Sequence, residues 1–235
     1  MMSIVISDLK KSFGAVTAVD IPELTINKGD LLGLVGNNGA GKTTLLRLLL
    51  DLTCPDSGTV SLNGINPRQS EDWKSWTGSY LDEGYLIDYL TPDEYFEFIA
   101  KIDGISSSEL KDRLTPMERF ANGEIFHERK YIRSFSAGNK QKIGIIAALI
   151  NQPQILILDE PFNFLDPSGQ EYLKAILTDY HTRTGATIIV SSHNLQHVTD
   201  ISTRILVMEK GVIVRDLPND NKTDVETELK DYFAI

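Results

Sequence analysis

The feature of the sequence that most constrains the fold is a glycine-rich loop between two apolar runs. The loop comprises Gly36, Asn37, Asn38, Gly39, Ala40, Gly41, Lys42, Thr43 and Thr44. Its three glycines lie within six residues. Each costs conformational entropy on folding and buries no side chain, so they are expected where the backbone wraps closely around something. Backbone amides at the start of a helix, next to a lysine, suit a polyphosphate.

The loop matches the phosphate-loop pattern G-x-x-x-x-G-K-[ST] in full, from Gly36 to Thr43. It follows residues 31–35, an apolar run suited to a buried parallel strand, and leads into a predicted helix at residues 43–52. In such a loop the amides cradle the α- and β-phosphates, Lys42 reaches the β- and γ-phosphates, and the Thr43 hydroxyl ligates Mg²⁺. A glycine-rich turn with an accidental lysine would not account for the strand and helix on either side.

Length and charge narrow the class of protein. A chain of 235 residues can form one large domain, or a core with an inserted subdomain. Its net charge of −10 argues against a general nucleic-acid-binding face, and its single cysteine, Cys54, excludes an internal disulfide. No apolar run reaches the ~18–20 residues that cross a bilayer. We therefore expect a cytoplasmic protein whose membrane role, if it has one, comes through a partner.

The order of elements predicts a single α/β domain. Short strand-like segments fill residues 3–35, a second buried strand is predicted at residues 155–158, and a further strand at residues 187–190. Thr91 and Ser106 are helix-start signals, and a further helix is expected from about Lys140. We predict one domain over residues 1–235: a core at about 1–85 and 150–214, a helical subdomain at about 86–149, and a short tail at 215–235.

A pair of acidic residues is the second feature that indicates a nucleotide site. Asp159 and Glu160 end the apolar run at residues 155–158. A carboxylate at the end of a strand can hold Mg²⁺, here Asp159, and its neighbour Glu160 can polarise an attacking water. Alone, the two acids would be read as a solvated turn. Together with the phosphate loop, they favour a nucleotide-hydrolysing site.

Five segments in fixed order give the chain its family resemblance: residues 36–44, 136–141, 155–161, 165–166 and 192–193. Over residues 4–213 the chain resembles the ABC-type ATPases. This resemblance implies an α/β P-loop NTPase (RecA-like) core with an N-terminal antiparallel β-subdomain and an inserted α-helical subdomain. It also implies ATP and Mg²⁺ as ligands, and a head-to-tail dimer with two ATP molecules between subunits, formed with a second copy or a homologous subunit.

The resemblance also implies roles for particular residues. Phe13 resembles the aromatic residue that stacks on adenine, and Asp159 the aspartate of the Mg²⁺ site. Glu160 resembles the general base, and His193 the switch histidine that contacts the γ-phosphate. These two and Lys42 form the predicted catalytic set.

Two further segments are implied to act across the dimer. Asp166 resembles the loop residue that couples the two sites. The family's signature loop, which faces the ATP of the other subunit, corresponds to Ser136, Ala137, Gly138 and Asn139.

The chain departs from the family pattern at two places. The usual signature is Leu-Ser-Gly-Gly-Gln, and Ala137 in place of the first glycine requires a backbone φ that is not positive. At the position of the usual glutamine after a core strand, counting back from Leu90 places Asp82. An acid there can ligate Mg²⁺, but its repulsion of the γ-phosphate is expected to slow turnover.

The function implied first is the ATPase subunit of an ABC transporter, with a separate membrane permease that contacts residues 85–90. Family resemblance leans towards an exporter of the drug, peptide or polysaccharide type. A soluble ABC ATPase acting on ribosomes or DNA is the alternative, against which the acidic charge argues. A slowly hydrolysing, nucleotide-dependent regulator is a third reading, based on Asp82 and the altered signature. Metal binding by His193 and His197, four residues apart, is not favoured.

Overall fold

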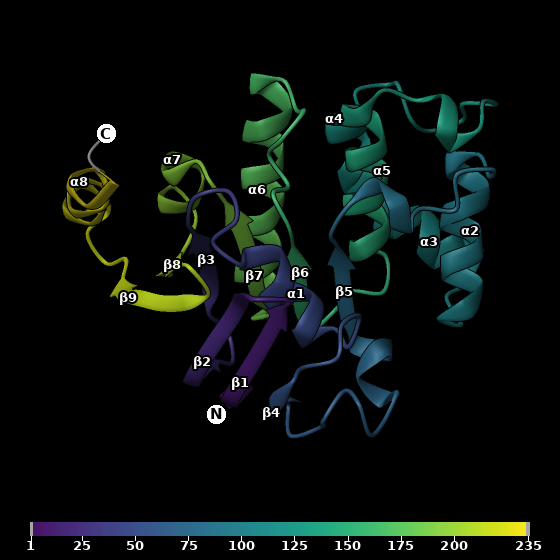
Figure 1. Cartoon of the computed structure of the whole chain (residues 1–235). Helices are drawn as coiled ribbons and strands as arrows, with labels where there is room; N and C mark the ends of the chain where they lie inside the picture. Colours follow the sequence, from purple (N-terminus) through teal and green to yellow (C-terminus); the bar gives the residue numbers. More distant parts are fainter. Residues whose placement is uncertain (1, 234–235) are drawn as a thin grey trace.

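The computed structural model describes residues 2–233, and two sheets form its framework. The predicted outer bounds of the domain, at Met1 and at residues 234–235, lie outside the described residues. Within the described residues, a six-stranded sheet has the order β5-β6-β7-β3-β8-β9 and a three-stranded sheet the order β2-β1-β4. In Figure 1 the small sheet lies at the bottom of the view and a lobe of helices lies at the right. No helix in residues 2–233 is long and apolar enough to cross a membrane.

The larger sheet contains the strands predicted to be buried. It comprises β3 (Leu31–Val35), β5 (Thr77–Tyr80), β6 (Ile155–Leu158), β7 (Thr187–Ser192), β8 (Arg204–Glu209) and β9 (Val212–Pro218). The pairs β5–β6, β6–β7, β7–β3 and β3–β8 are parallel, and only β9 runs antiparallel, beside β8. All residues of β3, β6 and β7 are buried, since both faces of the sheet are covered.

The smaller sheet is an antiparallel hairpin with one added strand. Its strands are β1 (Met2–Phe13), β2 (Val16–Asn27) and β4 (Ser57–Leu62). Helix α1 (Lys42–Leu49) lies between this sheet and the larger one, because its leucines pack in one cluster with residues of β1, β3 and β6. The short strand-like segments predicted in residues 3–26 are therefore parts of two long strands.

The helical subdomain follows β5. It contains α2 (Pro92–Ile102), α3 (Ser107–Leu114), α4 (Glu118–Ala121) and α5 (Ala137–Leu149), in the lobe on the right of Figure 1. Helices α2 and α3 begin at the predicted caps: Thr91 and Ser106 each form a capping box. Helix α5 is buried along most of its length and packs against β5, where Gly144 leaves room for the Tyr80 ring.

The last part of the chain returns to the core. Helix α6 (Pro167–Thr184) precedes β7, and α7 (Leu195–Thr199) lies between β7 and β8. Strand β9 extends to Pro218, four residues into the predicted tail. Helix α8 (Lys222–Phe233) packs on α7 through Val225 and Leu229, so the tail covers one edge of the core.

Candidate nucleotide-binding site

The phosphate loop, residues 36–44, joins β3 to α1 as predicted. Gly41 has φ 109°, and a Cβ there would lie 2.2 Å from the carbonyl oxygen of Ala18. A Cβ on Gly36 would lie 2.3 Å from the carbonyl oxygen of Met208. Only glycine fits these two positions, because the loop is pressed between β2 and the end of β8. Asn37, Asn38 and Gly39 are exposed at the rim of a hollow.

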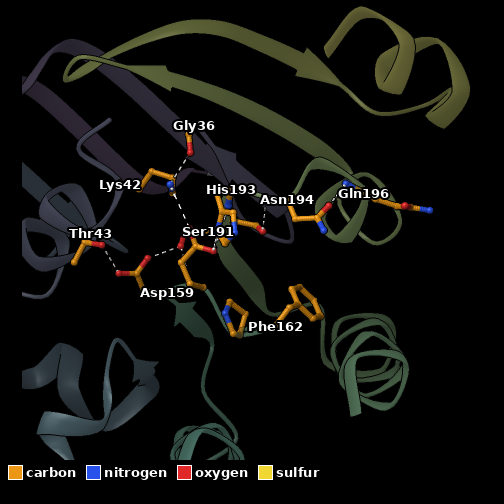
Figure 2. Close-up of polar contacts among 12 residues, drawn as sticks. Gly36, Lys42, Thr43, Asp159, Phe162, Ser191, His193, Asn194 and Gln196 are labelled. Carbon is orange, nitrogen blue, oxygen red and sulfur yellow. Dashed lines mark hydrogen bonds and ion pairs between the residues drawn. The ribbon is translucent and has the colours of Figure 1, made fainter. Parts of the chain in front are cut away.

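Lys42 is the buried cation of the site, with 7% of its surface exposed. Its Nζ donates a hydrogen bond to the carbonyl oxygen of Gly36 at 2.7 Å, and it lies 3.3 Å from Oε1 of Glu160. The side chain therefore folds back over the phosphate loop, as Figure 2 shows. An ammonium group held above exposed loop amides is suited to bind phosphate oxygens.

Asp159 lies at the end of β6 and points between two hydroxyl groups (Figure 2). Its Oδ2 accepts a hydrogen bond of 2.5 Å from Oγ1 of Thr43, and its Oδ1 accepts one from Oγ of Ser191. Burial raises the pKa of the Asp159 carboxyl above its ordinary value, against the lowering effect of these two hydrogen bonds. A hydroxyl and a carboxylate that face each other in this way fit Mg²⁺, which prefers oxygen ligands.

Glu160 contacts three other residues of the site: Lys42, Ser191 and His193. Its backbone is left-handed, with φ 47°, and its N–H donates to Oγ of Ser191 at 2.9 Å. Oε1 faces Lys42, and Oε2 accepts the backbone N–H of His193 at 3.2 Å and lies 2.8 Å from its Nδ1. The predicted catalytic set of Lys42, Glu160 and His193 is therefore brought together in one contiguous cluster.

The hairpin of the smaller sheet brings Phe13 towards the phosphate loop. Phe13 pairs with Val16 at the end of the hairpin, two residues before Ala18, which touches Gly41. The ring is 56% exposed and has Lys11 Nζ 5.4 Å from its centroid. An exposed ring at this edge is available to a nucleotide base.

The signature turn, residues 136–139, begins helix α5. Ser136 is the N-cap and accepts the N–H of Asn139, while Ala137 is the first helical residue and has no positive φ. Alanine is therefore compatible with this position. Helix α5 starts three residues earlier than predicted, because the cap lies at Ser136. Gly138 packs against the backbone of Phe164, where a Cβ would come within 2.5 Å of the carbonyl oxygen.

Asp166 is the N-cap residue of α6. Its carboxylate accepts a hydrogen bond from Ser168, which, together with the backbone N–H of Gly169, holds the pKa of Asp166 below its ordinary value. Asp166 thus stays charged at the end of the loop that Glu160 begins.

Asp82 is engaged with partners other than the Thr43–Asp159 pair. Its Oδ2 lies 3.3 Å from Arg47 of α1, and its Oδ1 accepts the N–H of Gly84 at 2.8 Å. Its neighbour Glu83 pairs with Lys140 of α5 at 3.0 Å. The predicted role of Asp82 at the metal remains a prediction, but Arg47 offsets part of its charge.

Two residues of the site carried no assigned role in the sequence analysis. Ser191 is fully buried and contacts both Asp159 and Glu160. Gln141 of α5 donates from Nε2 to the carbonyl oxygens of Glu160 and Pro161, at 3.2 and 2.5 Å. Gln141 lies inside a segment used for the family resemblance and Ser191 directly precedes another, so their positions were a signal. Their partners depend on long-range packing.

Comparison with known proteins decides the family. The family model described as "ABC transporter" matches residues 19–163, which is more than half of the chain. The chain belongs to the ABC transporter family. The predicted fold class is confirmed, and the chain is an ABC ATPase, an ATP-binding and ATP-hydrolysing cassette.

Individual relatives align over most of this ABC ATPase. The bacitracin transport ATP-binding protein of Enterococcus faecalis is 36% identical over 89% of this chain and 67% of its own length. The probable sulfate/thiosulfate import ATP-binding protein of Chlorella vulgaris is 32% identical over 91% of this chain and 90% of its own. A solved structure of an ATP-binding subunit of an ABC transporter superposes with a TM-score of 0.84 at 26% identity, covering 97% of this chain and 93% of that one.

Proposed function

We propose that this ABC ATPase powers a transporter as a separate subunit, dimerising on ATP and acting on a membrane permease. The observation that carries the proposal is the single cluster of Lys42, Glu160 and His193 beside the phosphate loop. It supplies a phosphate-binding cation, a carboxylate base and a switch side chain at one place.

The contacts of Glu160 support a division of roles in hydrolysis. Lys42 is poised to leave Oε1 of Glu160 for the β- and γ-phosphates of ATP. Oε1 is then free to accept a proton from the attacking water, while the His193 contacts hold Oε2 in place. ATP thus both fills the site and releases its base.

Thr43 and Asp159 are the residues that would hold Mg²⁺. When bound there, the ion neutralises charge on the β- and γ-phosphates. Buried Ser191 keeps the Asp159 carboxylate oriented towards Thr43.

The exposed signature turn supports a site completed by another subunit. Ser136 and Ala137 are exposed at the N-terminus of α5, where the helix dipole favours an anion. We assign this surface to the ATP held by a second copy of the chain or a homologous ATPase subunit, in head-to-tail arrangement.

Residues 85–90 are proposed as the permease contact, which would place the protein on the inner face of the cell membrane. Tyr85 and Tyr89 are 50% and 65% exposed, and Tyr85 borders a cavity of about 280 Å³ between the core and the helical subdomain. Of the eight aromatic residues at residues 73–98, Trp73, Tyr80 and Phe96 are buried core residues, whereas Tyr85, Tyr89 and Phe98 are exposed and available to a partner. The bacitracin-transport relative supports a drug- or peptide-type exporter.

The test is co-expression with a multi-helix membrane protein encoded beside this chain's gene. The tagged ATPase is expected to retain that protein through detergent extraction, and the double variant Tyr85→Ala and Tyr89→Ala to lose it. Tyr172 of α6 is also an exposed tyrosine, at 41%, and Tyr172→Ala is the control that should retain it. Retention that survives the double variant would contradict the contact, and absence of any retention would contradict the transporter role.

A further inference from the structure

The loop that follows Glu160, residues 160–166, is held by three helices. Gln141 of α5 donates to the carbonyl oxygens of Glu160 and Pro161. Gln170 of α6 donates to those of Phe162 and Leu165, at 3.2 and 3.3 Å. These contacts fix the backbone of the loop. The third helix, α7, contacts the side chain of Phe162.

His197 of α7 stacks on Phe162. The ring centroids are 4.7 Å apart and the planes are inclined at 31°, within the range of attractive ring pairs. Phe162 is only 2% exposed. The stack is therefore a packed contact between α7 and the 160–166 loop.

The environment keeps the His197 ring neutral. Nδ1 is buried and has no hydrogen-bond partner in the described residues, so protonating it would bury an unpaired donor. Burial lowers the pKa of His197, and the charge of Lys174 and the nearby His193 lower it further, against opposite effects from Asp200 and Glu171. At neutral pH the side chain acts as a flat aromatic surface.

The chain connectivity gives this stack a position in the catalytic cluster. His193 precedes His197 by four residues, at the turn between β7 and α7, and contacts Oε2 of Glu160. Phe162 follows Glu160 by two residues. A closed circuit therefore runs from Glu160 to His193, along α7 to His197, across the stack to Phe162 and back to Glu160.

We propose that His197 is a positioning residue, whose stack on Phe162 holds the Glu160 carboxylate and the His193 turn in a fixed relation. This rests on the proposed role of Glu160 as the general base. The left-handed backbone at Glu160 makes such support necessary, because an L-residue in this conformation persists only when its surroundings hold it there. The phosphate loop is not part of the circuit, so nucleotide binding is left to Lys42 and the loop amides.

Steady-state kinetics of the full chain provide the first test. His197→Ala is expected to lower kcat for ATP about tenfold and to change KM by less than about twofold, since misplaced catalytic groups affect the chemical step. His197→Phe keeps an aromatic ring and should restore kcat to within about twofold of the wild type. Equal loss in the Ala and Phe variants, or no loss in either, would overturn the proposal.

Amide hydrogen exchange provides a second test that does not need turnover. His197→Ala should accelerate exchange in residues 160–166 and 193–195 about tenfold, because local opening becomes easier. Phe162→Leu, which removes the stack from its other side, should do the same, and His197→Phe should not. Unchanged exchange in the Ala and Leu variants would overturn the proposal.

Val198→Ala is the matched control on the same helix. Val198 is fully buried and packs beside Gly33 of β3, in a hydrophobic cluster with Val225 and Leu229 that does not include Phe162. The Val198→Ala variant should lower Tm at least as much as His197→Ala, while amide exchange in residues 160–166 stays near the wild-type rate. Accelerated exchange in these residues would show that His197 contributes only general packing. If Glu160→Gln hydrolyses ATP normally, the base assignment fails, whereas the exchange results still decide whether the stack holds the loop.

Discussion

Glu160 divides its two carboxylate oxygens between Lys42 and His193. Its side chain is one-fifth exposed and that of Lys42 less than a tenth, so their attraction is screened less than that of a surface pair. Phosphate oxygens that bind Lys42 must compete with this carboxylate. The same contact that would hold the base idle without nucleotide would therefore release it when ATP binds.

Asp159→Asn tests the metal site at the level of one residue. Loss of the charge should lower Mg²⁺-dependent hydrolysis about a hundredfold, while nucleotide binding measured with EDTA should remain. Because burial raises the pKa of Asp159, the charged carboxylate costs stability at neutral pH, so the variant should unfold at the wild-type Tm or above it.

Thr43→Ser retains the hydroxyl and is the control for this site. It should keep most of the hydrolysis, since the Ser hydroxyl can still face Asp159. Full Mg²⁺-dependent turnover in the Asp159→Asn variant would refute the assignment of the metal site.

At the scale of elements, two helices offer a matched pair of caps. Ser136 caps α5 and Ser106 caps α3, each accepting the N–H of the third following residue at 3.3 Å. Replacing either by alanine should cost about 1 kcal/mol of stability, measured by urea unfolding. Only Ser136→Ala should also lower ATP turnover, because its hydroxyl is proposed to face ATP on the partner subunit. Equal effects of both variants on turnover would argue against that role.

The segment between β5 and α2 contains Asp82, the acid that is expected to slow hydrolysis. Removing the charge of Asp82 should raise kcat, up to about fivefold, if its repulsion of the γ-phosphate is worth roughly 1 kcal/mol. Asp82→Gln is the variant, measured by phosphate release. Glu83→Gln breaks the neighbouring pair with Lys140 and should leave kcat closer to the wild type. A fall in kcat for Asp82→Gln would instead indicate that the acid contributes to the metal site.

Local signals predicted some elements well and others not at all. Thr91 and Ser106 predict the starts of α2 and α3, because each is followed three positions later by the glutamate that completes its capping box. Strand β5 has only four residues and little apolar character, and it forms because Gly78 and Gly144 allow close packing of α5. That packing joins residues far apart in the chain, so no local pattern reveals it.

At the scale of the whole molecule, acid should weaken the fold partly through the helical subdomain. Hydrogen bonds from the backbone and side chain of Thr91 lower the pKa of Glu94 below 4.5, and those from Ser106 do the same for Glu109. A lowered folded-state pKa gives stability that is present above about pH 4.5 and lost as the pH falls through the lowered value.

The double variant Glu94→Gln and Glu109→Gln should therefore show a shallower loss of unfolding free energy between about pH 5 and pH 3 than the wild type. Urea unfolding across this range measures it. Identical slopes would show that the two capping boxes do not contribute to acid sensitivity.

The candidate site as a whole was predictable in membership but not in geometry. The sequence identifies Lys42, Asp159, Glu160 and His193 because each lies in a short motif at the end of a strand or the start of a helix. That Lys42 pairs with Glu160, and Asp82 with Arg47, follows from how α1 and the ends of β3, β5 and β6 are placed relative to one another. Parallel strands bring their ends to one edge, but the choice of partner there is set by side-chain packing.

The most direct test of the account is Glu160→Gln, measured for ATP hydrolysis and for mass by light scattering with ATP and Mg²⁺. Hydrolysis should fall at least about a hundredfold, as expected for loss of a general base. The ATP-bound variant should run at twice the 26.2 kDa of the monomer, and Lys42→Ala should neither bind ATP nor dimerise. Hydrolysis at the wild-type rate by Glu160→Gln, with no ATP-dependent dimer, would contradict the account.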